Sequence, residues 1–349
     1  MKKKSLVLLS KNTGKEFTGA TYSTFEYLKR IFSEYEKIII ITKNLGDSMD
    51  QLSQQSGNIE IIKFKNVFHA AYLIFLIRKE NIFGLSDDHF GFLFKFFKIK
   101  YLHIYHGNWP DAIFLSWIFF FKGLIFIPLY LLTLKFASYV VNVSFYMDRF
   151  TRLINSSSSV VRNGINHKKV RINMKNKNRV CDILMIGNID GRKYNDALKL
   201  FKLINLKGID DINFHIYGNI IDRELYKKLN SYNFVNFHGY QPYIEFSNFD
   251  VYMSLSKMEN LSISLVEALH NNLFVIGYNV GGSNEIVDNF VNGYLAPVGN
   301  YKDLYSVLIK FLNSYETINT SKHKLLEFDW ELSSQKLFLI LKNFTVEKQ

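Results

Sequence analysis

The sequence predicts an α/β protein of two domains, each built around a parallel β-sheet. Apolar runs typical of buried strands alternate with helical patterns along the chain, which is the order of elements in parallel sheets. At 349 residues the chain is long enough for two cores, and its 48% hydrophobic content excludes a disordered protein. A polar stretch at residues 166–179 is the predicted linker.

In the first half, a helix containing Phe25 and Leu28 follows the first strand and a loop. The predicted strands are residues 5–10, 37–42, 101–105 and 138–143. Three lysines precede the first strand, but the apolar run is too short for a signal peptide. The lone Cys181 cannot form an internal disulfide, so we expect a small buried side chain in a reducing cytoplasm.

In the second half, Glu259 and Glu267 bracket a predicted strand-to-helix turn. The predicted strands are residues 182–187, 214–218, 235–240, 251–255 and 273–276. Backbone N–H groups at a helix N-terminus stabilise phosphate, and carboxylates accept hydrogen bonds from sugar hydroxyls. The pattern therefore indicates a nucleotide-sugar site. The structural alternative is a capping box, in which Ser264 and Glu267 only stabilise the helix start.

The net charge of +12 is confined to the first half. Residues 1–171 contain 24 Lys and Arg against 12 Asp and Glu, whereas residues 172–349 contain 19 of each. The excess predicts an anionic partner for the first domain. No nucleic-acid-binding motif accompanies it, so we expect no nucleic acid and favour an anionic membrane surface.

An apolar segment at residues 112–134 and an aromatic and lysine-rich one at 89–100 support this interpretation. Lys122, Gly123 and Pro128 interrupt the first segment and argue against a bilayer span. A deeply buried helix is the alternative, but we favour interfacial contact with lipid headgroups. The expected membrane contacts are Trp117, Phe119, Phe120, Phe121 and Lys122.

The residues around the two glutamates resemble the donor-binding signature of a known family. The signature comprises Glu259, Glu267-Ala268, the apolar strand Phe274-Val275-Ile276, Gly281-Gly282-Ser283-Asn284-Glu285 and Asn292-Gly293-Tyr294-Leu295. It is similar to that of the retaining GT-B glycosyltransferases of family 4, the group 1 glycosyl transferases. The resemblance implies two Rossmann-like domains facing each other across a cleft. The N-terminal domain, residues 1–170, would bind the acceptor and face the membrane; residues 171–327 would bind the nucleotide sugar; and a helix in 328–349 would cross back to the first domain.

The resemblance also implies roles for individual residues. His106, at a strand end, would reach the transferred sugar, and Lys193 would pair with the donor diphosphate, with Arg192 beside it. Glu259 would face the sugar hydroxyls and Glu267 the ribose. The remaining expected donor contacts are Gly19, Gly218, Gly239, Tyr240, Asn260, Leu261 and Ser262. Asn188 stands where the family has an arginine, and Asn260 and Ser262 replace two glycines.

The resemblance implies a hexosyltransferase that retains anomeric configuration and uses a nucleotide sugar, UDP-linked rather than GDP-linked, with a glycan or lipid-linked acceptor. The chain has no Asp-x-Asp motif, so we expect no metal cofactor. We expect it in the cytoplasm, attached peripherally to the inner face of the cell membrane. The alternative is a non-catalytic GT-B subunit that partners another glycosyltransferase, which the changes at Asn188 and Asn260 keep open.

Overall fold

The computed structural model describes residues 5–107, 109, 111–165, 180–314 and 325–345. The chain divides into two compact units: Met1–Asn166 with Glu327–Gln349, and His167–Leu326. The predicted linker, residues 166–179, lies outside the described residues.

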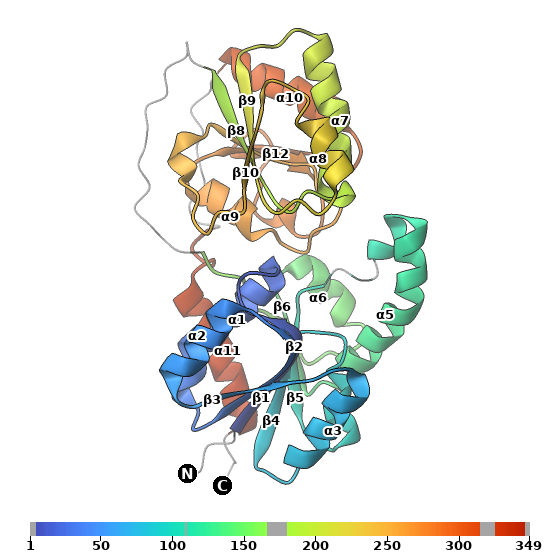
Figure 1. Ribbon diagram of the computed structural model, residues 1–349, viewed down its shortest axis with the longest axis vertical. Helices are drawn as coiled ribbons and strands as arrows, with labels where there is room; N and C mark the ends of the chain where they lie inside the picture. Colours follow the sequence, from blue (N-terminus) through green and yellow to red (C-terminus); the bar gives the residue numbers. More distant parts are fainter. Residues whose placement is uncertain (1–4, 108, 110, 166–179, 315–324, 346–349) are drawn as a thin grey trace. The chain divides into compact units, whose positions relative to one another are not determined.

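The first unit is a seven-stranded parallel sheet in the order β3-β2-β1-β4-β5-β6-β7 (Figure 1). Its strands are β1 (Ser5–Thr13), β2 (Ile38–Leu45), β3 (Ile59–Lys63), β4 (Ile82–Ser86), β5 (Tyr101–Tyr105), β6 (Tyr139–Asn142) and β7 (Ser158–Val160). Its α-helices are α1 (Gly19–Ile31), α2 (Asp47–Ser56), α3 (Val67–Ile77), α4 (Phe92–Phe96), α5 (Trp117–Phe136), α6 (Phe145–Thr151) and α11 (Trp330–Thr345).

Both faces of this sheet are buried, which explains the continuous apolar run of β1. Leu6 and Leu8 point into the core shared with α1, α2 and α11, while Val7 and Leu9 point into the core shared with α3, α4 and α5. Figure 1 shows α1, α2 and α11 on one side of the sheet and α3 and α5 on the other.

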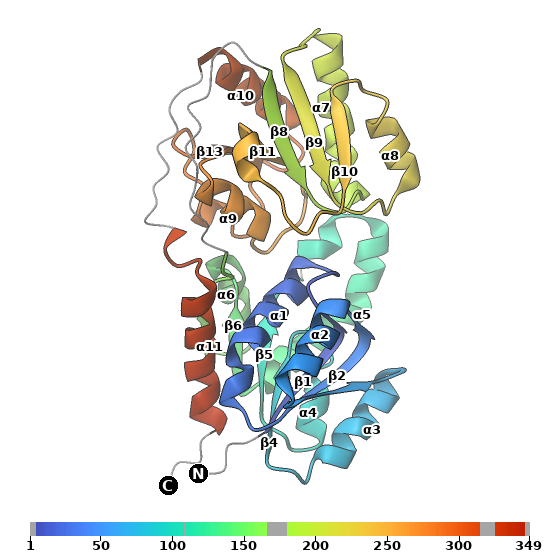
Figure 2. The ribbon, with the colours of Figure 1, turned by 60° about the vertical axis from the view of Figure 1, so that its left-hand side comes forward.

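The last helix, α11, completes the core of the first unit. Trp330 packs edge-on against Tyr27, with ring centroids 5.5 Å apart, and Leu337 and Leu341 are fully buried in the same cluster. Figure 2 shows α11 lying along α1. A Cβ on Gly164 would stand 2.3 Å from the Trp330 backbone nitrogen, so the close approach requires glycine there.

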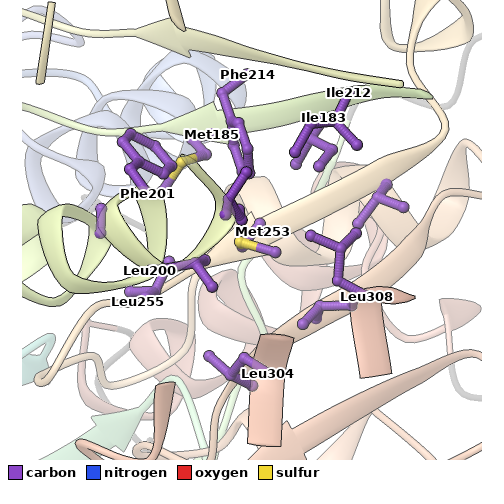
Figure 3. Packing of buried hydrophobic residues seen from close by; sticks show 14 of the residues in the cluster. Ile183, Met185, Leu200, Phe201, Ile212, Phe214, Met253, Leu255, Leu304 and Leu308 are labelled. Atoms are coloured by element: carbon purple, nitrogen blue, oxygen red, sulfur yellow. The ribbon is translucent and has the colours of Figure 1, made fainter. Parts of the chain in front are cut away.

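The second unit is a six-stranded parallel sheet in the order β10-β9-β8-β11-β12-β13. Its strands are β8 (Cys181–Ile186), β9 (Ile212–Tyr217), β10 (Val235–Gly239), β11 (Val251–Ser254), β12 (Phe274–Tyr278) and β13 (Gly293–Ala296). Its α-helices are α7 (Gly191–Leu206), α8 (Arg223–Leu229), α9 (Ile263–His270) and α10 (Tyr301–Ser314). Figure 3 shows the core in which Phe201 and Leu200 of α7 pack on Phe214 and Met253 of the sheet.

Helix α5 differs from one expectation and argues against the alternative of a deeply buried helix. It is continuous through Pro128, because a proline ring fits helical φ and its missing N–H removes a single backbone hydrogen bond. It is also not deeply buried: Gly123, Thr133 and Leu134 are its buried residues, and Trp117 is 78% exposed. By length and composition alone, α5 could cross a membrane.

Candidate nucleotide-sugar site

The candidate site in the second unit lies where its strand order reverses direction. Strands β8 and β11 are neighbours at the centre of the sheet, and their connections run to opposite sides. Ligands of open α/β sheets bind at this point, beyond the carboxyl ends of the strands. Lys193 follows β8, and Glu259 follows β11.

Lys193 and Glu259 form an ion pair at this edge. The Lys193 Nζ atom lies 3.0 Å from Glu259 Oε1, and both side chains are about three-quarters buried, with 26% and 23% exposed. The charge of Glu259 raises the pKa of Lys193 above its ordinary value, so the lysine is a cation at neutral pH. The structure thus brings together two of the predicted catalytic residues.

Gly187 provides the space that the Lys193 side chain occupies. Its φ of +146° lies in a region that favours glycine, and an added Cβ would stand 2.6 Å from Lys193 Cδ. Gly218, at the end of β9, packs on the same loop: an added Cβ there would stand 2.2 Å from the Gly187 carbonyl oxygen. The two glycines therefore allow the loops after β8 and β9 to pack against each other next to the Lys193 side chain.

Arg192 points toward a different partner. Its Nη2 atom lies 2.6 Å from Asp190 Oδ2, and Asp190 also caps α7 by accepting hydrogen bonds from the N–H groups of Arg192 and Lys193. Asn188, in place of the family's arginine, accepts a hydrogen bond of 3.2 Å from the N–H of Asn219 and so links the loops after β8 and β9.

The turn before α9 excludes the capping-box alternative. The N-cap of α9 is Ser262, whose hydroxyl accepts from the N–H of Leu265, so Ser264 lies inside the helix and cannot cap it with Glu267. Ser264 instead hydrogen-bonds the Tyr252 hydroxyl at 2.7 Å. This hydrogen bond could not be predicted from the sequence, because Tyr252 follows the same alternation on β11 as any buried strand residue.

Glu267 is a half-buried carboxyl on the first turns of α9. Burial raises its pKa to about 7, because the charged form loses hydration. Before it in the chain, Asn260 and Leu261 are buried. The Asn260 carbonyl accepts a hydrogen bond from the N–H of Gly282, and a Cβ on Gly281 would stand 2.0 Å from the Glu259 carbonyl oxygen. The Gly281-Gly282 pair of the signature thus fixes the turn that holds Glu259.

The predicted Gly239 and Tyr240 lie at the end of β10, on the same edge of the sheet. Gly239 has φ +66° with open space around it, and the Tyr240 side chain is 48% exposed. Beside them, Tyr217 stacks on His238, with ring centroids 4.5 Å apart and planes 12° from parallel. This aromatic pair escaped sequence reasoning because its members come from two strands.

The first unit contains the remaining predicted residues. Gly19 is the first residue of α1, next to the N-cap Thr18. His106 follows β5, and its Nε2 atom lies 3.3 Å from the Thr24 hydroxyl of α1, which in turn contacts Asp87. Burial lowers the pKa of His106 to about 4, so its ring is neutral at physiological pH.

Sequence comparison places the second unit in a family. Residues 166–324 match the model of Glycosyl transferases group 1. A segment of 158 residues is 25% identical to the UDP-N-acetylglucosamine–peptide N-acetylglucosaminyltransferase GtfA subunit of Streptococcus agalactiae, covering 43% of this chain and 31% of the relative. A segment of 162 residues is 28% identical to an uncharacterized glycosyltransferase of Methanocaldococcus jannaschii, covering 41% and 45%. The match thus spans less than half the length of either relative.

The fold is similar to that of solved structures over nearly the whole chain. Anabaena Alr3699/HepE, solved in complex with UDP and glucose, superposes with a TM-score of 0.76 at 14% identity, covering 97% of this chain and 100% of that one. Sucrose-phosphate synthase from Thermosynechococcus elongatus gives 0.77 at 14% identity, covering 98% and 99%. The lipopolysaccharide outer core galactosyltransferase WaaB gives 0.70 at 15% identity, covering 97% and 99%.

Two parallel Rossmann-like sheets, with a last helix that packs on the first of them, define a protein of the GT-B fold class. Residues 166–324 match the group 1 glycosyl transferases, as the resemblance in the sequence implied. The family and the fold class expected from the sequence are confirmed.

Proposed function

We propose that this protein is a retaining glycosyltransferase that moves a hexose from a nucleotide sugar to a membrane-associated acceptor. The ion pair of Lys193 and Glu259 at the strand-order reversal is the observation that supports it. A lysine ammonium suits a diphosphate, and a carboxylate suits sugar hydroxyls. The names of similar structures point the same way: HepE was solved with UDP-glucose, and WaaB is a lipopolysaccharide outer core galactosyltransferase. We therefore expect a UDP-sugar donor and a glycan or lipid-linked acceptor of a surface polysaccharide or other glycoconjugate.

In the proposed reaction, Lys193 and the N–H groups at the start of α9 stabilise the charge that develops on the departing diphosphate. Glu259 orients the sugar, and Glu267 binds the ribose. The family resemblance implies attack on the same face that the diphosphate leaves. Because the sequence has no Asp-x-Asp motif, we expect activity to be unchanged by EDTA.

Thermal unfolding in the presence of UDP, UDP-sugars and GDP-sugars tests this function. A ligand at a hundred times its dissociation constant stabilises the folded protein by about 2.7 kcal/mol, which is easily measured. We expect UDP and one UDP-sugar to raise the melting temperature, and that UDP-sugar to support transfer to a lipid-linked glycan. If no nucleotide or nucleotide sugar changes the melting temperature, the proposal is wrong.

A non-catalytic GT-B subunit is the second candidate. Asn188 and Arg192, near the phosphate-facing loop, are both engaged by neighbouring residues, Asn219 and Asp190. Under this alternative the protein would bind a nucleotide without transferring sugar until a second glycosyltransferase is added. Transfer by the purified chain alone, in saturating donor and acceptor, would exclude it.

We also propose that the first unit docks on an anionic membrane through a surface formed by α3, α4 and α5, which we call the apolar face. Its large exposed side chains include Phe68 at 82%, Trp117 at 78%, Phe96 at 72% and Phe121 at 62% exposure. Helices α3 and α4 are joined by the edge-on contact of Phe75 with Phe97, with ring centroids 6.0 Å apart. An exposed apolar surface of this kind marks an interaction site.

Cations lie on the aromatic rings of the apolar face. Arg78 lies 3.4 Å from the ring centroid of Phe75, Lys122 lies 5.5 Å from that of Phe119, and Lys95 lies 5.9 Å from that of Phe136. Basic groups among exposed aromatic rings are typical of proteins that lie in the headgroup region of anionic bilayers. This supports peripheral attachment at the inner face of the cell membrane, with the protein in the cytoplasm.

A further inference from the structure

A chain of hydrogen bonds connects three residues at the strand-order reversal of the first unit. Strands β1 and β4 are neighbours there. Asp87 follows β4, His106 follows β5, and Thr24 lies on α1 between them. The Thr24 Oγ1 atom is 2.7 Å from Asp87 Oδ2 and 3.3 Å from His106 Nε2. Thr24 is 2% exposed, so water does not compete for its hydroxyl.

The single proton of the Thr24 hydroxyl decides the direction of these bonds. An ionised carboxylate can only accept hydrogen bonds, so Thr24 donates its proton to Asp87. The short distance is typical of a charge-assisted bond. Thr24 must then act as acceptor toward His106, which requires a proton on Nε2. Because burial keeps the His106 ring neutral, its other nitrogen, Nδ1, carries no proton.

We propose that Asp87 is a positioning residue that acts through Thr24 to hold His106 in the Nε2–H tautomer, so that Nδ1 accepts a hydrogen bond from a sugar hydroxyl. No described residue hydrogen-bonds Nδ1. In the other tautomer, Nδ1 carries the proton and is a donor, so it could not accept a hydrogen bond from the sugar hydroxyl. The inference that the ligand is a sugar rests on the proposed transferase function, whereas the inference about the His106 tautomer does not.

The pKa of Asp87 lies in a range where the proposed effect on the His106 tautomer can be measured. Burial raises the pKa of Asp87 to about 7; the hydroxyls of Ser10 and Thr24 oppose this rise, and the negative charge of Asp88 adds to it. Asp88 is itself paired with His89 and attracted by Lys11. The nearby His103 is buried, and its pKa is lowered to about 3. Asp87 therefore changes charge near neutral pH.

The sign of the pH effect follows from these values. Above about pH 7 the Asp87 carboxylate is ionised and fixes the Thr24 proton. Below it, protonation removes the charged acceptor, and the tautomer preference of His106 weakens. The His106 ring stays neutral until about pH 4, so between the two values the tautomer changes without protonation of the ring.

Long-range proton–nitrogen NMR on protein with ¹⁵N-labelled histidine tests the proposal, because it reports each ring nitrogen separately. His106→Gln assigns the signals. At pH 8.5 we expect the wild type to show His106 as the Nε2–H form, and at pH 5.5 a mixture of neutral tautomers. Thr24→Val should show the mixture at both pH values, Thr24→Ser should restore the wild-type response, and Asp87→Asn should abolish the pH dependence.

Ser86→Ala is the matched control, because the buried Ser86 hydroxyl lies 2.8 Å from His103 Nδ1 on the same edge of the sheet. It should alter the His103 signals and leave those of His106 unchanged. An Nδ1–H tautomer in the wild type at pH 8.5, or a Thr24→Val spectrum identical to that of the wild type, would overturn the proposal. If Thr24→Val does not fold, the wild-type titration and Thr24→Ser still decide the outcome.

These spectra need no substrate, so they are independent of whether UDP-sugars bind. Where the UDP-sugar titration succeeds, Thr24→Val should also lower kcat and leave the donor KM unchanged. Thr24→Ser should restore kcat. A structural role for Thr24 would instead lower the melting temperature without changing the tautomer.

Discussion

The ammonium group of Lys193 lies 3.0 Å from the carboxylate of Glu259, and the two residues come from opposite sides of the strand-order reversal in the second unit. In the absence of nucleotide each neutralises the other in a partly buried place. A diphosphate would compete with Glu259 for the lysine, and the freed carboxylate could then accept hydrogen bonds from the sugar. Under the proposed function, the pair would be a preformed site whose partners are exchanged when donor binds.

Replacing Lys193 by alanine should reduce transfer strongly. We expect a cost of about 2–4 kcal/mol in transition-state stabilisation, comparable to losing one preorganised donor of an oxyanion hole. Glu259→Ala should also abolish transfer but with limited loss of UDP affinity. Single-turnover rates and UDP dissociation constants measure both effects. Lys199→Ala is the control, since Lys199 lies on the same helix and pairs with Asp196 at 2.7 Å.

Gly187→Ala should reproduce much of the Lys193 defect while the lysine is still present. The new Cβ would need a strained φ of +146° and would stand 2.8 Å from the Lys193 Nζ atom, so the ammonium must move. Gly208→Ala is the matched control, because Gly208 has φ +60° with no atom within 4 Å of the added Cβ. Both variants should melt at lower temperature, with a cost on the order of 1 kcal/mol for the control. Equal transfer rates in the two variants would show that Gly187 does not position Lys193.

The affinity for UDP should rise with pH around neutrality because of Glu267. Its pKa of about 7 means that the carboxylate, which would accept hydrogen bonds from the ribose hydroxyls under the proposed function, forms only as the pH passes that value. Titration calorimetry from pH 6 to pH 8 should show tighter binding by the wild type at higher pH. Glu267→Gln should bind more weakly, with no such rise, and Glu224→Gln on the exposed α8 is the control. A rise of equal size in Glu267→Gln would assign the pH effect to another group.

Ionisation of Glu267, which should strengthen UDP binding as the pH rises, should at the same time lower the stability of the folded protein. Burial favours the neutral acid, so the folded protein binds this proton more tightly than the unfolded chain, whose ordinary pKa is 4.5. The stability associated with it is fully present below pH 4.5 and is lost as the pH rises through about 7. Without nucleotide, Glu267→Gln should therefore gain in melting temperature relative to the wild type at pH 8.

Local patterns predicted much of this fold, and non-local contacts account for most of what they missed. The predicted strand at 101–105 matches β5, and the two glutamates do bracket the turn into α9. Thr24 and Asp87 are 63 positions apart and meet because β4 pairs with β1, which no local spacing shows. The pair of Asp190 with Arg192 was within reach of the sequence, because an Asp at a helix start accepts from the N–H groups that follow it.

Vesicle binding should depend on the exposed aromatic residues of α5. We expect sedimentation with vesicles containing phosphatidylglycerol, partly retained at high salt because buried apolar area is insensitive to screening. The double variant Trp117→Ser and Phe121→Ser should release the protein. Phe119 is excluded from the variant because its ring packs toward Trp109, with centroids 6.5 Å apart, and its loss would disturb the fold.

The matched control for membrane binding changes two exposed apolar residues of the second unit, Leu206→Ser and Ile221→Ser, which are 71% and 64% exposed. This control should bind vesicles as the wild type does. Circular dichroism should show that both double variants are folded. Equal vesicle binding by the wild type and the α5 variant, or no binding by the wild type, would refute membrane docking through α5.

The position of α11 has a consequence for how the chain matures on the ribosome. The first unit lacks Trp330, Leu337 and Leu341 of its core until the end of the chain has been translated. The second unit is continuous in sequence, from 167 to 326, and can fold as soon as it emerges. While the second unit is being synthesised, the side of α1 that carries Tyr27 and Leu28 is therefore not yet covered by α11. The part synthesised first is therefore the last to be completed.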